Sequence, residues 1–172
     1  MGGVAKALLD IRGMTFLARI ATTAREVGLV DAVVVVGPPF GDAVAAHARE
    51  LGLRTVVNPA PERGMASSIA LGFAAIAESS ATTAWLWPVD HPDVTARTLR
   101  TLVDARGDHE VARPRFRGRG GHPPLVSREV WPRLVGCVNA EGGARTVLAA
   151  ADVAEVEVDD AGVVEDYDEV RS

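Results

Sequence analysis

An apolar run that ends in a single carboxylate is the feature that most constrains this chain. Residues 84–89 have the length and hydrophobicity of a buried strand, and Asp90 follows them directly. Pro88 and Pro92 flank this carboxylate and force a turn before a helical pattern over residues 95–106. Ligands of open α/β sheets bind beyond the carboxyl ends of the strands, so Asp90 is placed to hold Mg²⁺ on a nucleotide phosphate. The alternative interpretation is an ordinary turn-forming aspartate beside proline.

Strand-like and helix-like patterns alternate along the chain. Apolar runs predict central strands at residues 32–36, 54–58 and 84–89, and a last strand at residues 153–158. Apolar residues at helical spacing predict helices at residues 15–27, 42–51, 65–79, 95–106, 127–135 and 144–151. This alternation predicts an α/β fold of Rossmann-like type, with a mostly parallel sheet, right-handed crossovers and helices on both faces.

The composition fits one class of protein and argues against several others. The 172 residues, of which 48% are hydrophobic, fit one domain spanning residues 1–172. No apolar run approaches the roughly 20 residues of a membrane span and the start lacks a signal-peptide layout, so we expect a cytoplasmic protein that binds no membrane. A single cysteine, Cys137, and four scattered histidines argue against a disulfide framework or a structural zinc site. The net charge of −5 argues against general attraction to nucleic acid.

Arginines recur at every second position in the segment that follows residue 110. Where the segment is extended, a period of two places their side chains on one face. The four residues are Arg113, Arg115, Arg117 and Arg119. One interpretation is a solvated edge strand whose charges discourage aggregation. The other is contact with an anionic ligand.

A loop at residues 59–64 leads into a helix that opens at Met65. Gly64 allows the backbone to approach a ligand closely, and the free N–H groups of the helix N-terminus suit an anion or a carbonyl group. Ser67 or Ser68 can cap this helix. An ordinary capped helix start explains the same residues without any ligand.

Six stretches, taken in order, resemble the molybdenum cofactor nucleotidyltransferases, most closely the cytidylyltransferase branch of the MobA-like group. They are residues 1–9, residues 58–59 with 64–72, and residues 89–92, 118–123, 142–145 and 166–168. The resemblance implies a nucleotidyltransferase fold of glycosyltransferase-A type. It also implies Mg²⁺-dependent transfer of a nucleotidyl group from CTP or GTP to the phosphate of molybdopterin, with release of pyrophosphate. A molybdoenzyme that receives the product is an implied partner.

The same resemblance assigns roles to individual residues. Lys6 and Asp90 match the catalytic pair, with Lys6 countering the charge of the triphosphate and Asp90 binding the metal together with Asp166 or Asp168. The implied nucleotide contacts are Lys6, Asn58, Gly64, Met65, Ser67 and Ser68. The implied acceptor contacts are Arg117, Arg119, Gly121 and His122, and His122 is assigned no catalytic proton transfer.

Three departures from the family pattern accompany the resemblance. Glu169 and Val170 stand where the family has Thr-Pro, and Glu141 stands where it has Asp. The family's first central strand and its Gly-rich phosphate loop precede the motif that here begins at Met1, so we expect either a chain that was cut or a short form that binds nucleotide poorly. Two alternatives therefore stay open: a non-catalytic nucleotide- or pterin-binding protein of the same fold, and a sugar-phosphate nucleotidyltransferase.

Overall fold

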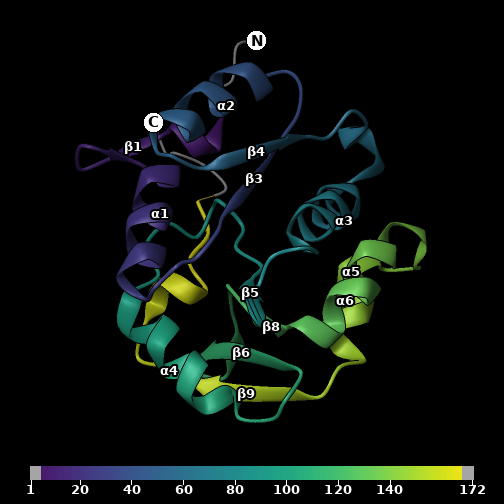
Figure 1. Cartoon of the computed structure of the whole chain (residues 1–172). Coiled ribbons are helices and arrows are strands. Elements are labelled where there is room, and N and C mark those ends of the chain that lie inside the picture. The colour runs from purple at the N-terminus through teal and green to yellow at the C-terminus, as the bar shows by residue number, and fades with distance from the viewer. Residues whose placement is uncertain (1–4, 168–172) are drawn as a thin grey trace.

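Helices cover both faces of two neighbouring sheets, and residues 10–15 form a third, two-stranded antiparallel sheet (Figure 1). The computed structural model describes residues 5–167. The helices are α1 (Phe16–Glu26), α2 (Gly41–Glu50), α3 (Met65–Ile76), α4 (Ala96–Arg106), α5 (Trp131–Val135) and α6 (Gly143–Ala149). The strands are β1 (Asp10–Ile11), β2 (Met14–Thr15), β3 (Val33–Val36), β4 (Arg54–Val57), β5 (Thr83–Trp85), β6 (Val111–Phe116), β7 (Arg119–Gly120), β8 (Leu125–Ser127) and β9 (Val153–Glu157). Short 3₁₀ turns are η1 (Lys6–Leu8), η2 (Pro61–Arg63), η3 (Arg128–Val130), η4 (Gly136–Asn139) and η5 (Ala161–Val163). The α/β class is therefore confirmed.

The strands run in mixed directions. β3 and β4 pair in parallel, as the crossover through α2 requires. In the larger part the order is β5-β8-β6-β7, with β9 also paired to β6. The β6–β9 pair is parallel, whereas β5–β8, β6–β8 and β6–β7 are antiparallel, so the expectation of a mostly parallel sheet holds for only part of it. β6 pairs with β9 along one edge, from Val111 to Arg115, and with β8 and then β7 along the other. The edge-strand interpretation is therefore wrong for β6, which carries Arg113 and Arg115, and is confirmed for β7, the last strand in the order, which carries Arg119.

β5 is shorter than the predicted strand at residues 84–89. Its ladder with β8 ends at Trp85, opposite Leu125. Leu86 N–H still donates to the Pro124 carbonyl at 3.1 Å, but prolines at positions 123 and 124 have no N–H group to return. The chain from Leu86 to Asp90 is therefore irregular, and Asp90 lies beyond the end of the strand instead of directly on it.

Two groups of helices enclose the sheet, with α1, α2 and α4 on one side and α3, α5 and α6 on the other (Figure 1). The first group buries Leu17, Ala21, Val44 and Ala48 together with Val36 of β3. The second buries Phe73, Trp131, Leu134 and Ala144 together with Val126 of β8. These are the apolar positions at helical spacing, so the burial follows from the sequence pattern. Within residues 5–167, no helix has the length and apolar character needed to cross a bilayer.

The helix starts differ in how they are capped. The Thr15 and Thr95 hydroxyls accept hydrogen bonds from Ala18 N–H at 3.1 Å and Thr98 N–H at 3.3 Å, at the starts of α1 and α4. The residue before α3 is Gly64, which supplies no side-chain cap. The expectation that Ser67 or Ser68 caps this helix is wrong, because both lie inside its first turn.

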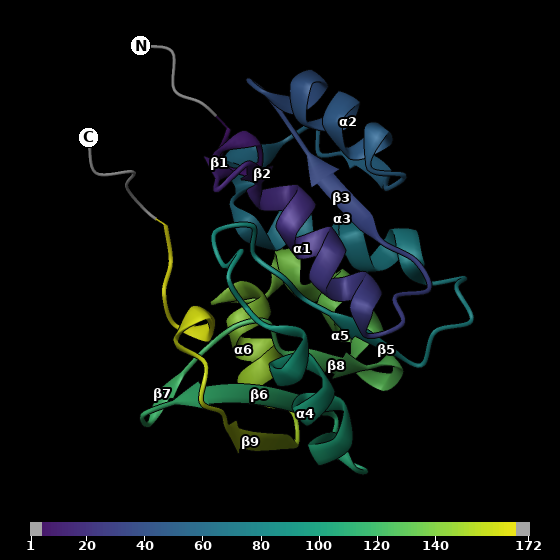
Figure 2. The same ribbon diagram turned by 90° about the vertical axis from the view of Figure 1, so that its left-hand side faces the viewer.

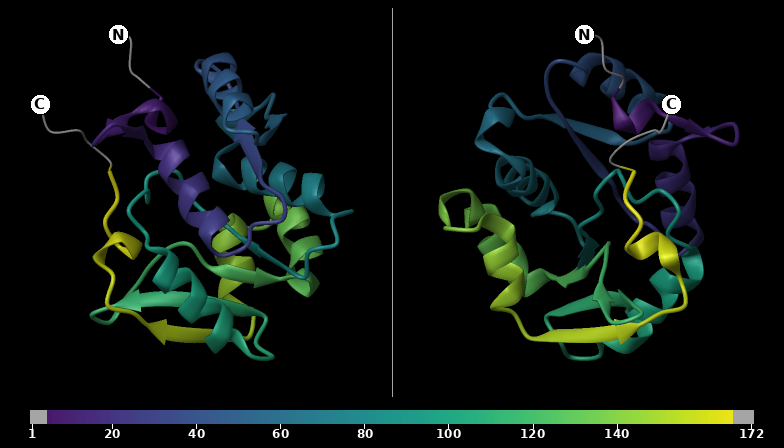
Figure 3. Two further views of the ribbon diagram at one scale, coloured as in Figure 1. Left: turned by 60° about the vertical axis from the view of Figure 1, so that its left-hand side comes forward. Right: turned by 180° about the vertical axis from the view of Figure 1, so that it is seen from behind.

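The chain after β9 returns to the N-terminal elements. Figures 2 and 3 show this yellow segment, which includes η5, running past β7 toward the purple start of the chain. At its end the Tyr167 ring packs edge-on against the buried Phe16 ring, with centroids 5.0 Å apart. The C-terminal segment is thus part of the folded structure as far as Tyr167.

Candidate nucleotide and metal site

Lys6 and Asp90, predicted to act together, face each other beyond the end of β5. Lys6 Nζ lies 3.6 Å from Asp90 Oδ2. The two side chains are 35% and 26% exposed, so a ligand can reach both. Lys6 is the only lysine of the chain, whose other 17 basic side chains are all arginines. A compact ammonium group therefore stands beside the carboxylate, so the ammonium could contact a phosphate whose metal ion the carboxylate would hold.

The turn that carries Asp90 is held by main-chain hydrogen bonds. Tyr167 N–H donates to the Asp90 carbonyl at 3.2 Å, and His91 N–H donates to the Pro88 carbonyl at 3.2 Å. The Trp87 indole N–H donates to the His91 carbonyl at 2.9 Å. We call residues 90–94 the metal-side loop. The Asp90 carboxylate takes no part in these bonds and is left to face Lys6.

Three side chains that the sequence reasoning did not select fix the far end of the metal-side loop. Asp93 pairs with Arg19 of α1 and accepts a hydrogen bond from the Tyr167 hydroxyl. The hydrogen bond to Asp93 raises the pKa of the Tyr167 hydroxyl. Arg19 and Asp93 stand 74 positions apart in the sequence, so no local pattern could have found this pair. One sequence signal could have identified Tyr167, because it stands between Asp166 and Asp168, the two predicted metal ligands near the C-terminus.

The donor set fits a hard divalent cation that is shared with a substrate. Asp166 is exposed and directly precedes Tyr167, whose N–H group bonds to Asp90, so both predicted carboxylates belong to one neighbourhood. Asp168 lies outside the described residues. Residues 5–167 contain no group of three or more histidine, cysteine or carboxylate side chains that could enclose a metal ion alone. One or two carboxylates completed by water and phosphate oxygens is the coordination that Mg²⁺ prefers.

Asn58 organises the loop before α3. Its side chain is 1% exposed, and its amide N–H groups donate to the Ser67 and Ser68 hydroxyls at 2.8 and 2.9 Å. Its carbonyl oxygen accepts from Ala60 N–H at 3.0 Å. We call Asn58, Ser67 and Ser68 the Asn58 cluster. Because Asn58 and the buried Ser67 are already hydrogen-bonded, their direct contribution is to shape the loop.

Gly64 and Met65 present the accessible surface beside this cluster. Gly64 has φ +84°, which disfavours any side chain, and no atom lies within 4 Å of the place where a Cβ would stand. Met65 is 71% exposed. Of the predicted nucleotide contacts, these two are the open ones. The joint binding of a nucleotide by the Asn58 cluster and the Lys6–Asp90 pair stays a prediction.

His122 lies against the metal-side loop. Its ring and the buried His91 ring have centroids 5.0 Å apart. Burial lowers the pKa of His122, the neighbouring His91 and Arg113 lower it further, and Asp90 opposes them. Gly121, beside it, leaves no room for a side chain, because a Cβ there would stand 2.4 Å from the Val163 carbonyl oxygen. Two of the predicted acceptor residues are therefore next to the Asp90 turn.

Arg117 and Arg119 are exposed on the hairpin between β6 and β7. Arg117 has φ +51° and its guanidinium lies 5.0 Å from the Phe116 ring centroid. Arg113, which belongs to the arginine row but not to the predicted acceptor contacts, lowers the pKa of His122 by its charge and pairs with Glu155. The arginine row is thus divided between an inner residue beside the site and outer residues at the hairpin tip.

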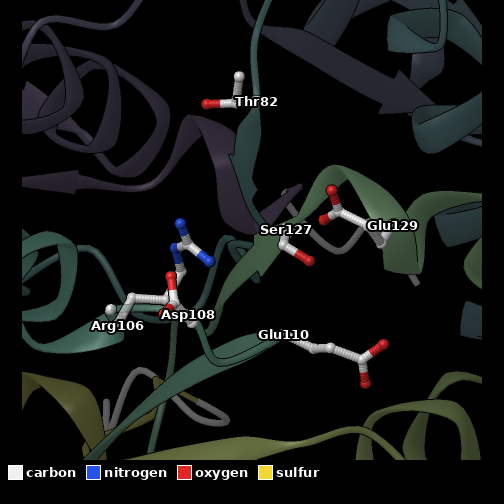
Figure 4. A pocket seen from close by; sticks show the side chains of 7 residues that line it. Thr82, Arg106, Asp108, Glu110, Ser127 and Glu129 are labelled. Carbon is white, nitrogen blue, oxygen red and sulfur yellow. The ribbon is translucent and has the colours of Figure 1, made fainter.

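A polar cavity of about 300 Å³ lies at the other end of the sheet (Figure 4). Thr82 and Glu110, which line it, precede β5 and β6, whereas Asp90 follows β5. The Glu110 carboxylate already binds Arg133 and accepts from Asp152 N–H at 2.9 Å. Ligands of α/β sheets bind at the carboxyl ends of strands, so this cavity is separate from the candidate site.

Solved structures with this fold define the class of protein. A nucleotidyl transferase from Methanothermobacter superposes with a TM-score of 0.76 over 94% of this chain and 79% of its own, at 19% identity. Rv0371c from Mycobacterium tuberculosis H37Rv superposes with a TM-score of 0.73 over 91% of this chain and 80% of its own, at 26% identity. A second structure of Rv0371c is a complex with manganese. The fold is that of the nucleotidyltransferases.

The family follows from the sequence profile. The chain belongs to the MobA-like NTP transferase domain family, whose profile matches residues 1–156, and it is a nucleotidyltransferase. Nicotine blue oxidoreductase from Paenarthrobacter nicotinovorans is 29% identical over 155 residues, which cover 86% of this chain and 74% of that protein. Nucleotidyltransferase membership, expected from the six motifs, is thereby confirmed.

Proposed function

We propose that this protein transfers CMP or GMP from CTP or GTP to the phosphate of molybdopterin and releases pyrophosphate. The observation that carries the proposal is the Lys6–Asp90 pair, 3.6 Å apart and accessible beyond the end of β5 in a MobA-like fold. A phosphate oxygen of the acceptor attacks the α-phosphorus, and the bond between that phosphorus and the pyrophosphate oxygen breaks. Enzymes promote such a displacement mainly by alignment and charge neutralisation.

The residues divide these tasks between them. Lys6 stands where its ammonium group counters the charge of the triphosphate, and the surface at Gly64 and Met65 takes the base and ribose. Asp90, with Asp166 or Asp168, would hold Mg²⁺, which neutralises phosphate charge when bound. Arg117, Arg119, Gly121 and His122 form the acceptor side. We expect a molybdoenzyme to receive the product.

The proposal is tested by measuring pyrophosphate release. Purified protein is incubated with CTP, GTP, ATP or UTP, with molybdopterin, and with Mg²⁺, Mn²⁺ or a chelator. We expect release that requires the divalent ion, the acceptor and one of CTP or GTP. Sugar phosphates in place of molybdopterin test the second acceptor class. Nucleotide binding without release from any acceptor would instead support the non-catalytic binding protein.

The single lysine makes a second test possible without an acceptor. Periodate-oxidised CTP or GTP, which carries a ribose dialdehyde, is reduced onto the protein with borohydride, and the labelled peptide is identified by mass spectrometry. We expect labelling at Lys6 that Mg²⁺ with unmodified nucleotide prevents. The α-amino group is the internal control, because its labelling should not depend on Mg²⁺. Labelling that unmodified nucleotide does not reduce would remove Lys6 from the nucleotide site.

The oxidoreductase relative gives the assay one further control. Its name describes a different reaction, so NADH and NADPH oxidation is followed in parallel with a quinone acceptor. We expect no oxidation of either coenzyme by this chain. Turnover of NADPH without pyrophosphate release would contradict the transferase proposal.

A further inference from the structure

The C-terminal turn at residues 160–163 lies between the metal-side loop and residues 120–122. We call this turn the clamp, and residues 120–122 the acceptor-side segment. On one side the His91 ring Nδ1–H donates to the Gly162 carbonyl at 3.3 Å, which ties the clamp to the metal-side loop. On the other side His122 N–H donates to the Val163 carbonyl at 2.8 Å. Consecutive carbonyl groups of one turn therefore fix His91 and His122, whose rings lie in contact.

Asp160 anchors the clamp to the start of α4. Its Oδ2 atom accepts from Thr95 N–H at 2.9 Å, the Thr95 hydroxyl at 2.8 Å and the Thr98 hydroxyl at 2.6 Å. Its Oδ1 atom accepts from Gly162 N–H at 3.0 Å. The Asp160 carboxylate thus joins the clamp to the residues that follow the metal-side loop. It does so at the N-terminus of α4, the helix end that favours negative charge.

The clamp is packed without free space on both sides. A Cβ at Gly162 would stand 2.7 Å from the Asp93 carbonyl carbon and oxygen. A Cβ at Gly121 would stand 2.4 Å from the Val163 carbonyl oxygen. Val163 itself is 0% exposed and packs with Val94 and Leu99. Any shift of the clamp must therefore move the metal-side loop or the acceptor-side segment.

We propose that the clamp sets the distance between the metal-side loop and the acceptor-side segment, and that Asp160 is the positioning residue that holds it. The inference rests on the proposed function, because it concerns the alignment of the acceptor with the nucleotide. Asp160 touches neither the Lys6–Asp90 pair nor the Asn58 cluster, so it acts on the reaction only through the two segments that it places. Nucleotide transfer depends steeply on alignment, and a displacement of about 1 Å costs on the order of 100-fold in rate.

The test compares Asp160→Ala with the matched control Asp159→Ala, which removes the neighbouring exposed carboxylate. We expect Asp160→Ala to lower kcat by on the order of 100-fold and to raise the KM of the acceptor. The affinity for CTP or GTP, measured by calorimetry, should fall much less than kcat, because Lys6 and the Gly64–Met65 surface lie on other elements and of the nucleotide side only Asp90 belongs to the metal-side loop. Asp160→Asn keeps one carbonyl oxygen as acceptor and should restore part of kcat. Asp159→Ala should match the unsubstituted protein.

A second readout does not depend on activity. In protein without nucleotide, the His91 and His122 ring protons should show a nuclear Overhauser contact, because the ring centroids lie 5.0 Å apart. We expect this contact to be lost in Asp160→Ala and kept in Asp159→Ala. If the unsubstituted protein transfers nucleotide to no acceptor, the proposed function fails while the ring contact still tests the clamp.

Gly162→Ala keeps the test decisive if Asp160→Ala does not fold. This variant retains the Asp160 carboxylate and pushes the clamp away from Asp93, so the same loss of ring contact and of kcat is expected. Folded Asp160→Ala or Gly162→Ala protein that keeps the ring contact would overturn the proposal. So would a variant that loses nucleotide affinity and kcat in equal measure.

Discussion

The Asn58 cluster and the metal-side loop of the candidate site are held together over very different sequence distances. In the Asn58 cluster the hydrogen bonds join residues 9 and 10 positions apart. Around the metal-side loop, Asp93 is bound from 74 positions away by Arg19 and Tyr167, and His91 from 71 positions away by Gly162. The first network needs only a short loop to close. The second exists only when both ends of the described chain have folded onto the same turn.

This difference in range predicts a difference in cooperativity. Closing a short loop costs little chain entropy, whereas contacts of high sequence separation form late and depend on the whole fold. A substitution in the Asn58 cluster should therefore act mainly on local stability. A substitution around the metal-side loop should act on alignment and on several elements at once.

The largest expected effect is that of Asp90→Asn, in the metal-side loop. Removing the charge that faces Lys6 and would hold the metal should cost about 2–4 kcal/mol in transition-state stabilisation, or roughly 30- to 1,000-fold in kcat/KM. Because the side chain is partly exposed and outside the core, the melting temperature should change little. Pyrophosphate release measures the loss in kcat/KM, and Mg²⁺-dependent calorimetry with CTP and GTP measures the loss of binding, with exposed Asp104→Asn as control. Equal metal-dependent binding by both variants would remove Asp90 from the site.

Asn58→Ala should have the next largest effect, on stability. It removes three hydrogen bonds and leaves the Ser67 hydroxyl and Ala60 N–H without that partner, so we expect about 2–3 kcal/mol of lost unfolding free energy. Ser68→Ala removes one of these bonds and should cost about 1 kcal/mol. Urea denaturation of both variants compares them. Equal costs for the two would show that the cluster is not organised around Asn58.

The acceptor side should respond to acid through His122. Burial lowers the pKa of this residue in the folded protein, with His91 and Arg113 acting in the same direction and Asp90 against it. The unfolded chain, with a histidine pKa near 6.5, then binds the proton more readily. Stability is fully present above that value and is lost as the pH falls below it. Urea denaturation at pH 7.5 and 5.0 should show a smaller loss for His122→Gln than for the unsubstituted protein, and an unchanged loss would contradict this assignment.

The smallest expected effect on stability is that of Arg119→Ala at the hairpin tip. Its side chain is exposed, so the unfolding free energy should change by less than about 0.5 kcal/mol. If it contacts the acceptor phosphate as proposed, the KM of the acceptor should rise while the affinity for the nucleotide is kept. Arg113→Ala is the comparison, because Arg113 lies beside His122 and pairs with Glu155. If only Arg113→Ala raises the KM of the acceptor, the acceptor phosphate is assigned to Arg113 instead of Arg119.

Much of the fold could be predicted because its signals are local. Apolar spacing identified α1 to α4 with errors of at most three residues at their ends, and the valine run identified β3. The direction of β5, β6 and β8 could not be predicted in this way, because alternation of strands and helices does not specify which strands pair. The length of β5 depended on Pro123 and Pro124, which directly precede β8 and stand 38 positions beyond Trp85 and Leu86, outside any local window around β5.

The sequence by itself determined the chemistry of the candidate site, and the tertiary structure decided its geometry. Lys6, Asp90, Asn58, Gly64 and His122 were predicted from six short motifs whose order resembles one family, and their residue types restrict the chemistry that each can perform. The pairing of Lys6 with Asp90, the ring contact of His91 with His122 and the bonds of Asp160 to the start of α4 were decided by packing. Such contacts join residues scores of positions apart, and only the burial of shared apolar surface brings them within bonding distance.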